Sequence, residues 1–217
     1  MTDGVGRALQ SRLSLAQWLS PGFPVSAYAY SHGLEQAITA GQIHDADSLR
    51  IWLEGLLMAG SCQTDGLLVA RAAAGDPLEV LAEAAEALAT SAERWSETRD
   101  QGAAFVQTTN ALCPEQLSPL PYPVAVGARA RSLGLPPEEV VALYLQAFLG
   151  GLISGAVRLI PLGQTEGQRV SQALHDAISA EATRLAALPL EEVATSALRG
   201  DLAAMGHETQ EVRIFRT

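Results

Sequence analysis

Residues 140–157 read VVALYLQAFLGGLISGAV and carry no charged side chain over 18 positions. A run of that length is at the lower limit for a membrane-spanning helix. Gln146, Ser154 and three glycines interrupt its apolar character, and no second apolar span occurs in the sequence. The preceding PPEE at 136–139 is typical of the first turn of a helix. We therefore expect a buried core helix over about 137–159 and no membrane association.

Gly151 and Gly155 stand four residues apart in this stretch, so they share one face of the predicted helix. Small residues at that spacing allow a second helix backbone to approach closely. The sequence leaves open whether that backbone belongs to the same chain or to a second subunit.

Composition extends the helical prediction to the whole chain. Of 217 residues, 37 are alanine and only 5% are aromatic, which favours helices over strands. The formal net charge of −10 argues against a nucleic-acid-binding protein, which would carry a basic patch. All 14 basic residues are arginine, which excludes sites that need a lysine, such as the phosphate-binding P-loop.

Apolar periodicity, prolines and glycines divide the chain into about ten helices joined by short loops. We predict one all-α domain over residues 1–206, a single helical bundle, followed by a flexible tail over 207–217. The helices are expected at about 7–19, 31–40, 46–59, 64–74, 76–88, 92–112, 124–133, 137–159, 165–185 and 190–202.

Motifs for common catalytic chemistry are absent from the sequence. Cys62 and Cys113 are 51 residues apart and no CxxC is present. There is no GxSxG and no glycine-rich phosphate loop between a strand and a helix. We expect no enzymatic activity and no tightly bound cofactor.

One pair, His32 and Glu35, has the three-residue spacing that can share a metal ion on a helix. Carboxylate-bridged metal sites normally need that pair twice, with two further glutamates. We favour a polar helix start and expect no metal site. Few cysteines and no apolar signal-peptide region in the first thirty residues predict a cytoplasmic protein.

The segment SPGFPVSAYAYSHGLE at 20–35 concentrates aromatic side chains in a rigid, proline-containing junction. Aromatic residues on a rigid loop suit a contact surface, because little conformational entropy is lost on binding. The alternative is a tightly packed loop in which Tyr30 belongs to the core. The sequence does not separate the two.

The last residues, HETQEVRIFRT at 207–217, combine arginines with Ile214 and Phe215. Chain ends beyond the last helix usually fray, but these two side chains are costly to leave in water. A tail with apolar anchors and arginines can become ordered on a partner protein.

Four motifs resemble those of one known family. The segment at 20–35 resembles the SPxxPxGxFxYSxGLE signature of the urease accessory protein family UreF. RLIPLGQ at 158–164 is similar to that family's R-L-x-P-L-G-Q motif, and ERWSETRDQG at 93–102 also fits. The tail resembles the family's HETQYTRLFRS ending. The motifs occur in the same order and span nearly the whole chain. The sequence departs from the pattern at Ser26 and Ala27, where glycines are usual, and at Tyr28 and Glu211.

The resemblance implies a non-catalytic, all-helical homodimer. UreF proteins bridge the accessory protein UreD (UreH in some organisms) and the GTPase UreG, and the complex directs nickel, with a lysine carbamate, into apo-urease. Nickel would be handled by the assembled complex, and the tail would be ordered by UreD and help to recruit UreG. The residues expected at partner interfaces are Tyr28, Tyr30, His32, Glu35, Arg158, Gln164, His207, Glu208, Gln210, Arg213, Phe215 and Arg216.

Two other functions stay open on the sequence. The chain could regulate GTP hydrolysis by UreG, with Arg158, Arg94 or Arg99 supplied in trans. Against this, a cation at Arg158 is also expected simply to stabilise the end of the apolar helix. Alternatively, His32 and Glu35, together with His207, would make the chain a nickel carrier.

Overall fold

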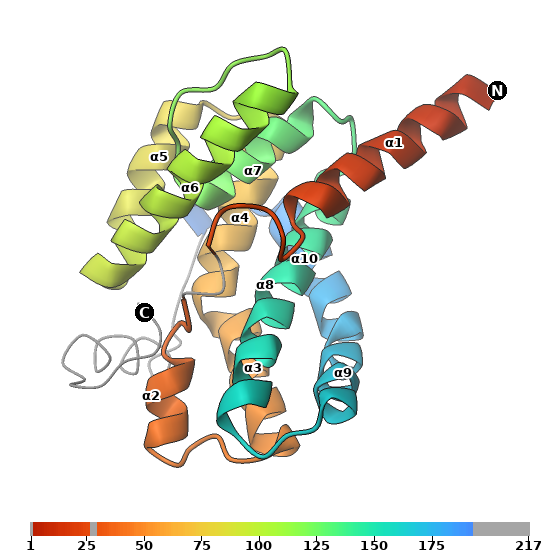
Figure 1. Ribbon diagram of the computed structural model, residues 1–217. Helices are drawn as coiled ribbons and strands as arrows, with labels where there is room; N and C mark the ends of the chain where they lie inside the picture. The colour runs from red at the N-terminus through yellow and green to blue at the C-terminus, as the bar shows by residue number, and fades with distance from the viewer. Residues whose placement is uncertain (1, 27–29, 193–217) are drawn as a thin grey trace.

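The computed structural model describes residues 2–26 and 30–192, and within these ranges it contains helices and no strand (Figure 1). The all-α prediction is therefore confirmed for the described part of the chain. The elements are α1 (Thr2–Trp18), α2 (Leu34–Thr39), α3 (Ala46–Ala59), α4 (Ser61–Ala74), α5 (Leu78–Ala87), α6 (Ala92–Leu112), α7 (Tyr122–Arg131), α8 (Pro137–Leu159), α9 (Gln164–Ala173), α10 (His175–Ala187) and a 3₁₀ turn at Leu190–Glu192.

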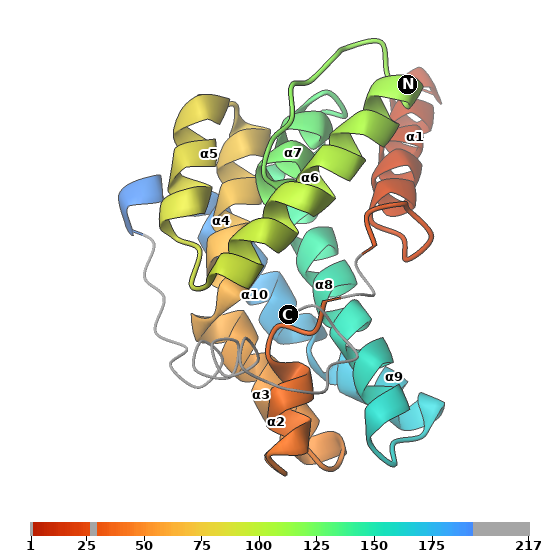
Figure 2. The same ribbon diagram turned by 60° about the vertical axis from the view of Figure 1, so that its left-hand side comes forward.

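α8 is the apolar helix expected from the charge-free stretch. It is long and apolar enough to cross a membrane by length and composition, but its inner face carries core side chains such as Leu145 and Leu149, which are at most 1% exposed. α8 packs against α4 and α10, and the other helices surround this centre (Figures 1 and 2). This placement agrees with the expectation of a core helix.

Two glycines bring the central helices unusually close together. A Cβ on Gly127 of α7 would lie 2.3 Å from the Val69 carbonyl oxygen of α4, and one on Gly66 of α4 would lie 2.7 Å from Leu185 Cδ1 of α10. At Gly127 no other residue type fits unless the backbone of α4 moves, whereas at Gly66 the Leu185 side chain would have to shift. This close packing fixes α4, whose side chains are buried over most of its length.

Three predicted helix starts were wrong by three residues or more. α1 begins at Thr2 rather than at residue 7, and α4 begins at Ser61 rather than at residue 64, directly after Gly60. α2 begins only at Leu34, not at residue 31, because His32 and Gly33 adopt φ angles of 51° and 78°. Left-handed backbone at two successive residues cannot be part of a right-handed helix.

The helix predicted over 165–185 is two helices, α9 and α10, which meet at Leu174. Leu174 is 1% exposed, and its N–H donates to the Ser171 carbonyl in a tight turn. Neither glycine nor proline marks this turn, so the sequence pattern continues through it. Of the helix predicted over 190–202, only Leu190–Glu192 lies within the described residues, as a 3₁₀ turn.

The first helix leaves the body of the molecule at its N-terminal end (Figures 1 and 2). Its C-terminal half is anchored by Leu15 and Trp18, which are 0% and 4% exposed. Ser11 Oγ donates a hydrogen bond of 2.8 Å to the Leu133 carbonyl. Arg12 Nε lies 2.6 Å from Glu139 Oε1 at the start of α8.

Candidate interaction surface

The segment at 20–35 is packed inward over most of its described residues. Phe23 is 6% exposed and lies with its ring centroid 5.5 Å from that of Phe105 on α6. Tyr30 is 8% exposed. The packed-loop interpretation therefore holds for these two aromatics, while Tyr28 lies outside the described residues. Ser26 has a φ of 56°, a left-handed backbone that fits the glycine usual at this part of the family's motif.

The left-handed turn at His32 points its imidazole into the protein. The ring packs against Phe148 of α8 in a tilted arrangement, with a centroid distance of 4.5 Å and an angle of 59° between the ring planes, and Nε2 lies 3.0 Å from Glu97 Oε1 on α6. His32 is 9% exposed. A strained backbone conformation at a non-glycine residue persists only where surrounding contacts hold it. Here the contacts that hold it tie the signature segment to α6 and α8.

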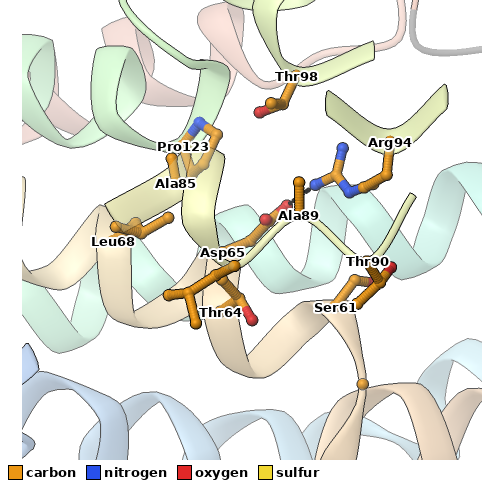
Figure 3. A pocket seen from close by; sticks show the side chains of 12 residues that line it. Ser61, Thr64, Asp65, Leu68, Ala85, Ala89, Thr90, Arg94, Thr98 and Pro123 are labelled. Carbon is orange, nitrogen blue, oxygen red and sulfur yellow. Dashed lines mark hydrogen bonds and ion pairs between the residues drawn. The ribbon is translucent and has the colours of Figure 1, made fainter. Parts of the chain in front are cut away.

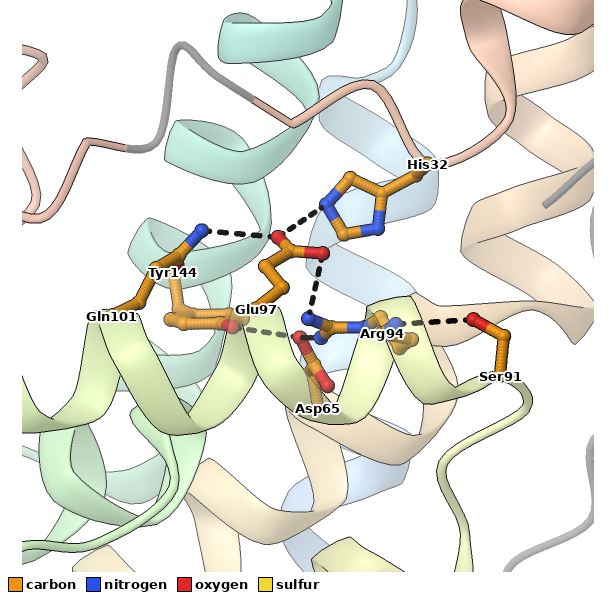
Figure 4. Close-up of polar contacts among 7 residues, drawn as sticks. All are labelled: His32, Asp65, Ser91, Arg94, Glu97, Gln101 and Tyr144. Carbon is orange, nitrogen blue, oxygen red and sulfur yellow. Dashed lines mark hydrogen bonds and ion pairs between the residues drawn. The ribbon is translucent and has the colours of Figure 1, made fainter. Parts of the chain in front are cut away.

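His32 is the outer end of a buried polar cluster that joins four elements (Figure 4). Arg94 NH1 lies 3.2 Å from Glu97 Oε2, and Arg94 NH2 donates a 2.6 Å hydrogen bond to Asp65 Oδ2 of α4. The Tyr144 hydroxyl of α8 donates to the same Asp65 oxygen at 2.8 Å. Gln101 Nε2 donates to Glu97 Oε1 at 3.0 Å.

The cluster holds two carboxylates against one guanidinium, so it is electrically balanced when the His32 imidazole carries a proton. Burial disfavours the charged form of Glu97, but the charges of His32 and Arg94 outweigh it and lower the pKa of this carboxyl. Burial, followed by the negative charge of Asp65, raises the pKa of Tyr144, which keeps its hydroxyl a donor. Through these hydrogen bonds and ion pairs the cluster joins the signature segment, α4, α6 and α8.

A shallow hollow on the surface brings two of the sequence motifs together. Tyr30 and Ser31 come from the signature segment, and Arg158 begins the RLIPLGQ motif at the last turn of α8. Between them lies the small-residue face of α8. The hollow is lined by Tyr30, Ser31, Leu34, Gly151, Leu152, Ser154, Gly155 and Arg158.

The small-residue face is open. A Cβ built on Gly151 meets no atom within 4 Å, and Gly151 and Arg158 are both exposed. The close approach that Gly151 permits is therefore not taken up by another helix within the described residues, and Gly155 is half-buried.

A second recess lies between the start of α4, the end of α5 and α6 (Figure 3). Its lining is mixed: hydroxyls from Ser61, Thr90 and Thr98 lie beside the Asp65–Arg94 ion pair, and apolar side chains such as Leu68, Ala85, Leu88 and Pro123 complete it. The Thr98 hydroxyl is buried and has no hydrogen-bond partner among the described residues.

Known sequences resemble this chain over nearly its whole length. The UreF family model matches residues 43–175. A protein named urease accessory protein UreF from Dinoroseobacter shibae is 75% identical over 209 residues, covering 96% of this chain and all of that protein. The chain belongs to the UreF family. Proteins of the same name from Cereibacter sphaeroides and Jannaschia sp. are 56% and 48% identical, with coverage of 94% and 100% of this chain and 98% and 100% of their own lengths.

In this UreF-family chain, the residues predicted at partner interfaces fall into three groups. Tyr30 and Arg158 meet at the hollow, and Gln164 is exposed at the start of α9, where Glu166 Oε2 accepts the Gly163 N–H at 3.1 Å. The structure places His32 and Glu35 in the interior, at 9% and 5% exposure, so neither presents its side chain on the surface. The third group, Tyr28, His207, Glu208, Gln210, Arg213, Phe215 and Arg216, lies outside the described residues.

Within the described ranges, no three His, Cys, Asp or Glu side chains are grouped so that they could hold a metal ion. Of the metal-ligand candidates there, His32 lies with Nε2 3.0 Å from Glu97 Oε1 and packs against the Phe148 ring. The third member of the suggested nickel-carrier set, His207, is outside these ranges.

The buried cluster is the feature that sequence reasoning missed. Arg94 was considered as a residue that reaches a partner's nucleotide, but its side chain is only 13% exposed and is held by two carboxylates. Arg99, at 63%, faces solvent. The ERWSETRDQG motif was the only sequence signal for this cluster, since it contains Arg94 and Glu97. Asp65 and Tyr144 could not be linked to it, because they stand 79 residues apart in the sequence.

Proposed function

We propose that this UreF-family chain is a non-catalytic scaffold for urease maturation, located in the cytoplasm. It bridges UreD and the GTPase UreG, and the assembled complex directs nickel into apo-urease. The observation that carries this proposal is full-length similarity to proteins named as urease accessory proteins. The hollow supports it, because two separate family motifs contribute neighbouring residues to one surface.

The proposal is tested by nickel loading of apo-urease with purified components. We expect metal in urease, measured by atomic spectroscopy together with urea hydrolysis, only when this chain, UreD and UreG are all present with GTP, nickel and bicarbonate. Equal loading when this chain is left out would refute the scaffold function. A mixture that lacks UreG serves as the negative control.

The scaffold is proposed to be a homodimer that uses the open face of α8. Gly151 and Gly155 line the hollow together with Tyr30. A Cβ added at Gly151 would meet no atom within 4 Å. Small residues on an exposed helix face permit close helix packing. The small residues of this face would let a second helix approach closely, and Tyr30 and Arg158, which belong to two family motifs, border the same hollow.

Gly151→Leu is expected to shift the protein from dimer to monomer without loss of helical content. In the monomer a Cβ at Gly151 meets nothing within 4 Å, so the added side chain obstructs only a second chain. The matched control is Gly55→Leu in α3, where a Cβ also meets nothing. Analytical ultracentrifugation measures the effect, and a dimer equally stable in both variants would contradict this interface.

A second candidate function is regulation of UreG, because Arg158 is exposed in the last turn of α8 with no ion pair among the described residues. An arginine supplied in trans can raise the turnover of a GTPase by about 10³–10⁵-fold. If Arg158 acts in this way, Arg158→Ala lowers GTP hydrolysis in the complex towards that of UreG alone, whereas Arg169→Ala, at an exposed position on α9, does not. Identical turnover with and without the wild-type chain would remove this function.

A further inference from the structure

We propose that the outward face of α1 docks into an apolar groove with an acidic rim on a partner protein. α1 carries two apolar faces. The inner one, with Leu15 and Trp18, holds the helix to the body. The outer one consists of Val5, Leu9 and Leu13, which are 73%, 57% and 62% exposed.

The three outer side chains form one continuous stripe. They stand at positions i, i+4 and i+8, and at 100° per residue they fall within an arc of about 80°. Ser11 and Leu15, which face the body, lie on the other side of the helix. Aliphatic anchors at this spacing are the pattern by which an amphipathic helix binds in a groove.

The position of α1 makes the stripe accessible. The helix projects from the body, and its contacts with it come from its C-terminal half (Figures 1 and 2). Single exposed aliphatic side chains are common on protein surfaces and need no explanation. An aligned set of three on a projecting helix is different, because nothing in the described part of the chain covers it.

Two considerations select the occupant. Three aliphatic side chains offer on the order of 300 Å² of apolar surface to a neighbour. Two α1 helices packed on each other would thus bury well below the roughly 1,000 Å² that a stable interface needs. A groove that encloses the flanks of the helix as well buries more, which favours a larger partner over a second copy of α1.

The charge of α1 indicates that the rim of the partner's groove is acidic. α1 contains Arg7 and Arg12 against a single acid, Asp3, in a chain whose formal net charge is −10. Arg7 is exposed, and Arg12, although paired with Glu139, keeps a 52% exposed side chain. A basic helix on an acidic body is complementary to carboxylates on the partner, which also repel the rest of this chain and fix the orientation.

This inference rests on the proposed function, because the probes are purified UreD and UreG, each tested alone and together. We expect the double variant Leu9→Glu/Leu13→Glu to bind its partner at least about 30-fold more weakly by calorimetry. Arg7→Glu is expected to weaken binding about 10-fold at low salt, with a smaller effect at high salt. The matched control is Val80→Glu on α5, which replaces an aliphatic side chain that is 50% exposed.

The outcomes separate the possibilities. Unchanged affinity of the double variant would overturn the docking face, and unchanged affinity of Arg7→Glu would overturn the acidic rim. Loss of the homodimer with retained partner binding would assign the stripe to a second copy and overturn the inference. If the wild-type chain itself binds neither probe, the proposed function fails and this inference fails with it. Circular dichroism confirms that the variants, all at exposed positions, keep their helices.

Discussion

Removing residues 207–217 is expected to abolish binding to UreD and UreG while the helical body stays folded. Within the described residues, the buried core is built from residues between Leu15 and Leu185. The tail carries Ile214 and Phe215 as apolar anchors, with Arg213 and Arg216 for charge-assisted contacts. Loss of several anchors at once is expected to lower affinity beyond detection.

The measurement is co-purification of UreD with the truncated chain, together with circular dichroism and a sizing experiment on the truncated chain alone. A matched variant keeps the tail length and replaces only Ile214 and Phe215 by serine, which should reproduce most of the loss. Retained binding of UreD by the truncated chain would show that the tail is not the docking element. An unfolded truncated chain would contradict the expectation that the body is independent.

Arg94→Met is expected to destabilise the protein by about 3–5 kcal/mol, the usual cost of removing one partner from a buried ion pair. Arg94 donates to Asp65 at 2.6 Å and lies 3.2 Å from Glu97, and both carboxylates are at most 6% exposed. Methionine fills much of the same space but leaves those charges without their guanidinium. Glu97 then keeps His32 but loses its ion pair with Arg94. Because His32 belongs to the signature segment, we expect the attachment of that segment to weaken as well.

Urea unfolding followed by far-UV circular dichroism measures this effect. The matched control is Arg99→Met on the same helix, where the guanidinium is 63% exposed and lies 3.6 Å from Asp100. Such a surface pair is worth about 0–1 kcal/mol, so the control should unfold almost like the wild type. Equal stability of the two variants would mean that the buried cluster does not hold the fold together.

Much of the fold follows from the sequence, as α8 illustrates. A charge-free run with PPEE before it predicts both the start of the helix and its burial, because both signals are local. The break at Leu174 could not be predicted, since a buried leucine sits in the turn and the apolar pattern runs on through it. The same holds for the left-handed turn at His32, which depends on Glu97 and Phe148, residues far away in the sequence.

The candidate surface, likewise, was predicted from sequence motifs only in part. Tyr30 and Arg158 were each predicted from motifs, but only the folded chain shows that they border one hollow. The burial of His32 and Glu35 was not predicted, because a polar motif residue looks the same in sequence whether it faces a partner or the core. The exposed stripe of α1 could not be predicted, because the helical spacing of Leu9 and Leu13 is the same whether these side chains face the core or the solvent.

The central claim, a dimeric scaffold that joins two different proteins, is tested most directly by native mass spectrometry. The chain is tagged and co-expressed with the UreD and UreG of the same organism, and the purified product is weighed intact. The account predicts a complex that contains two copies of each of the three proteins. Recovery of the chain alone, with neither UreD nor UreG at any stoichiometry, would contradict it.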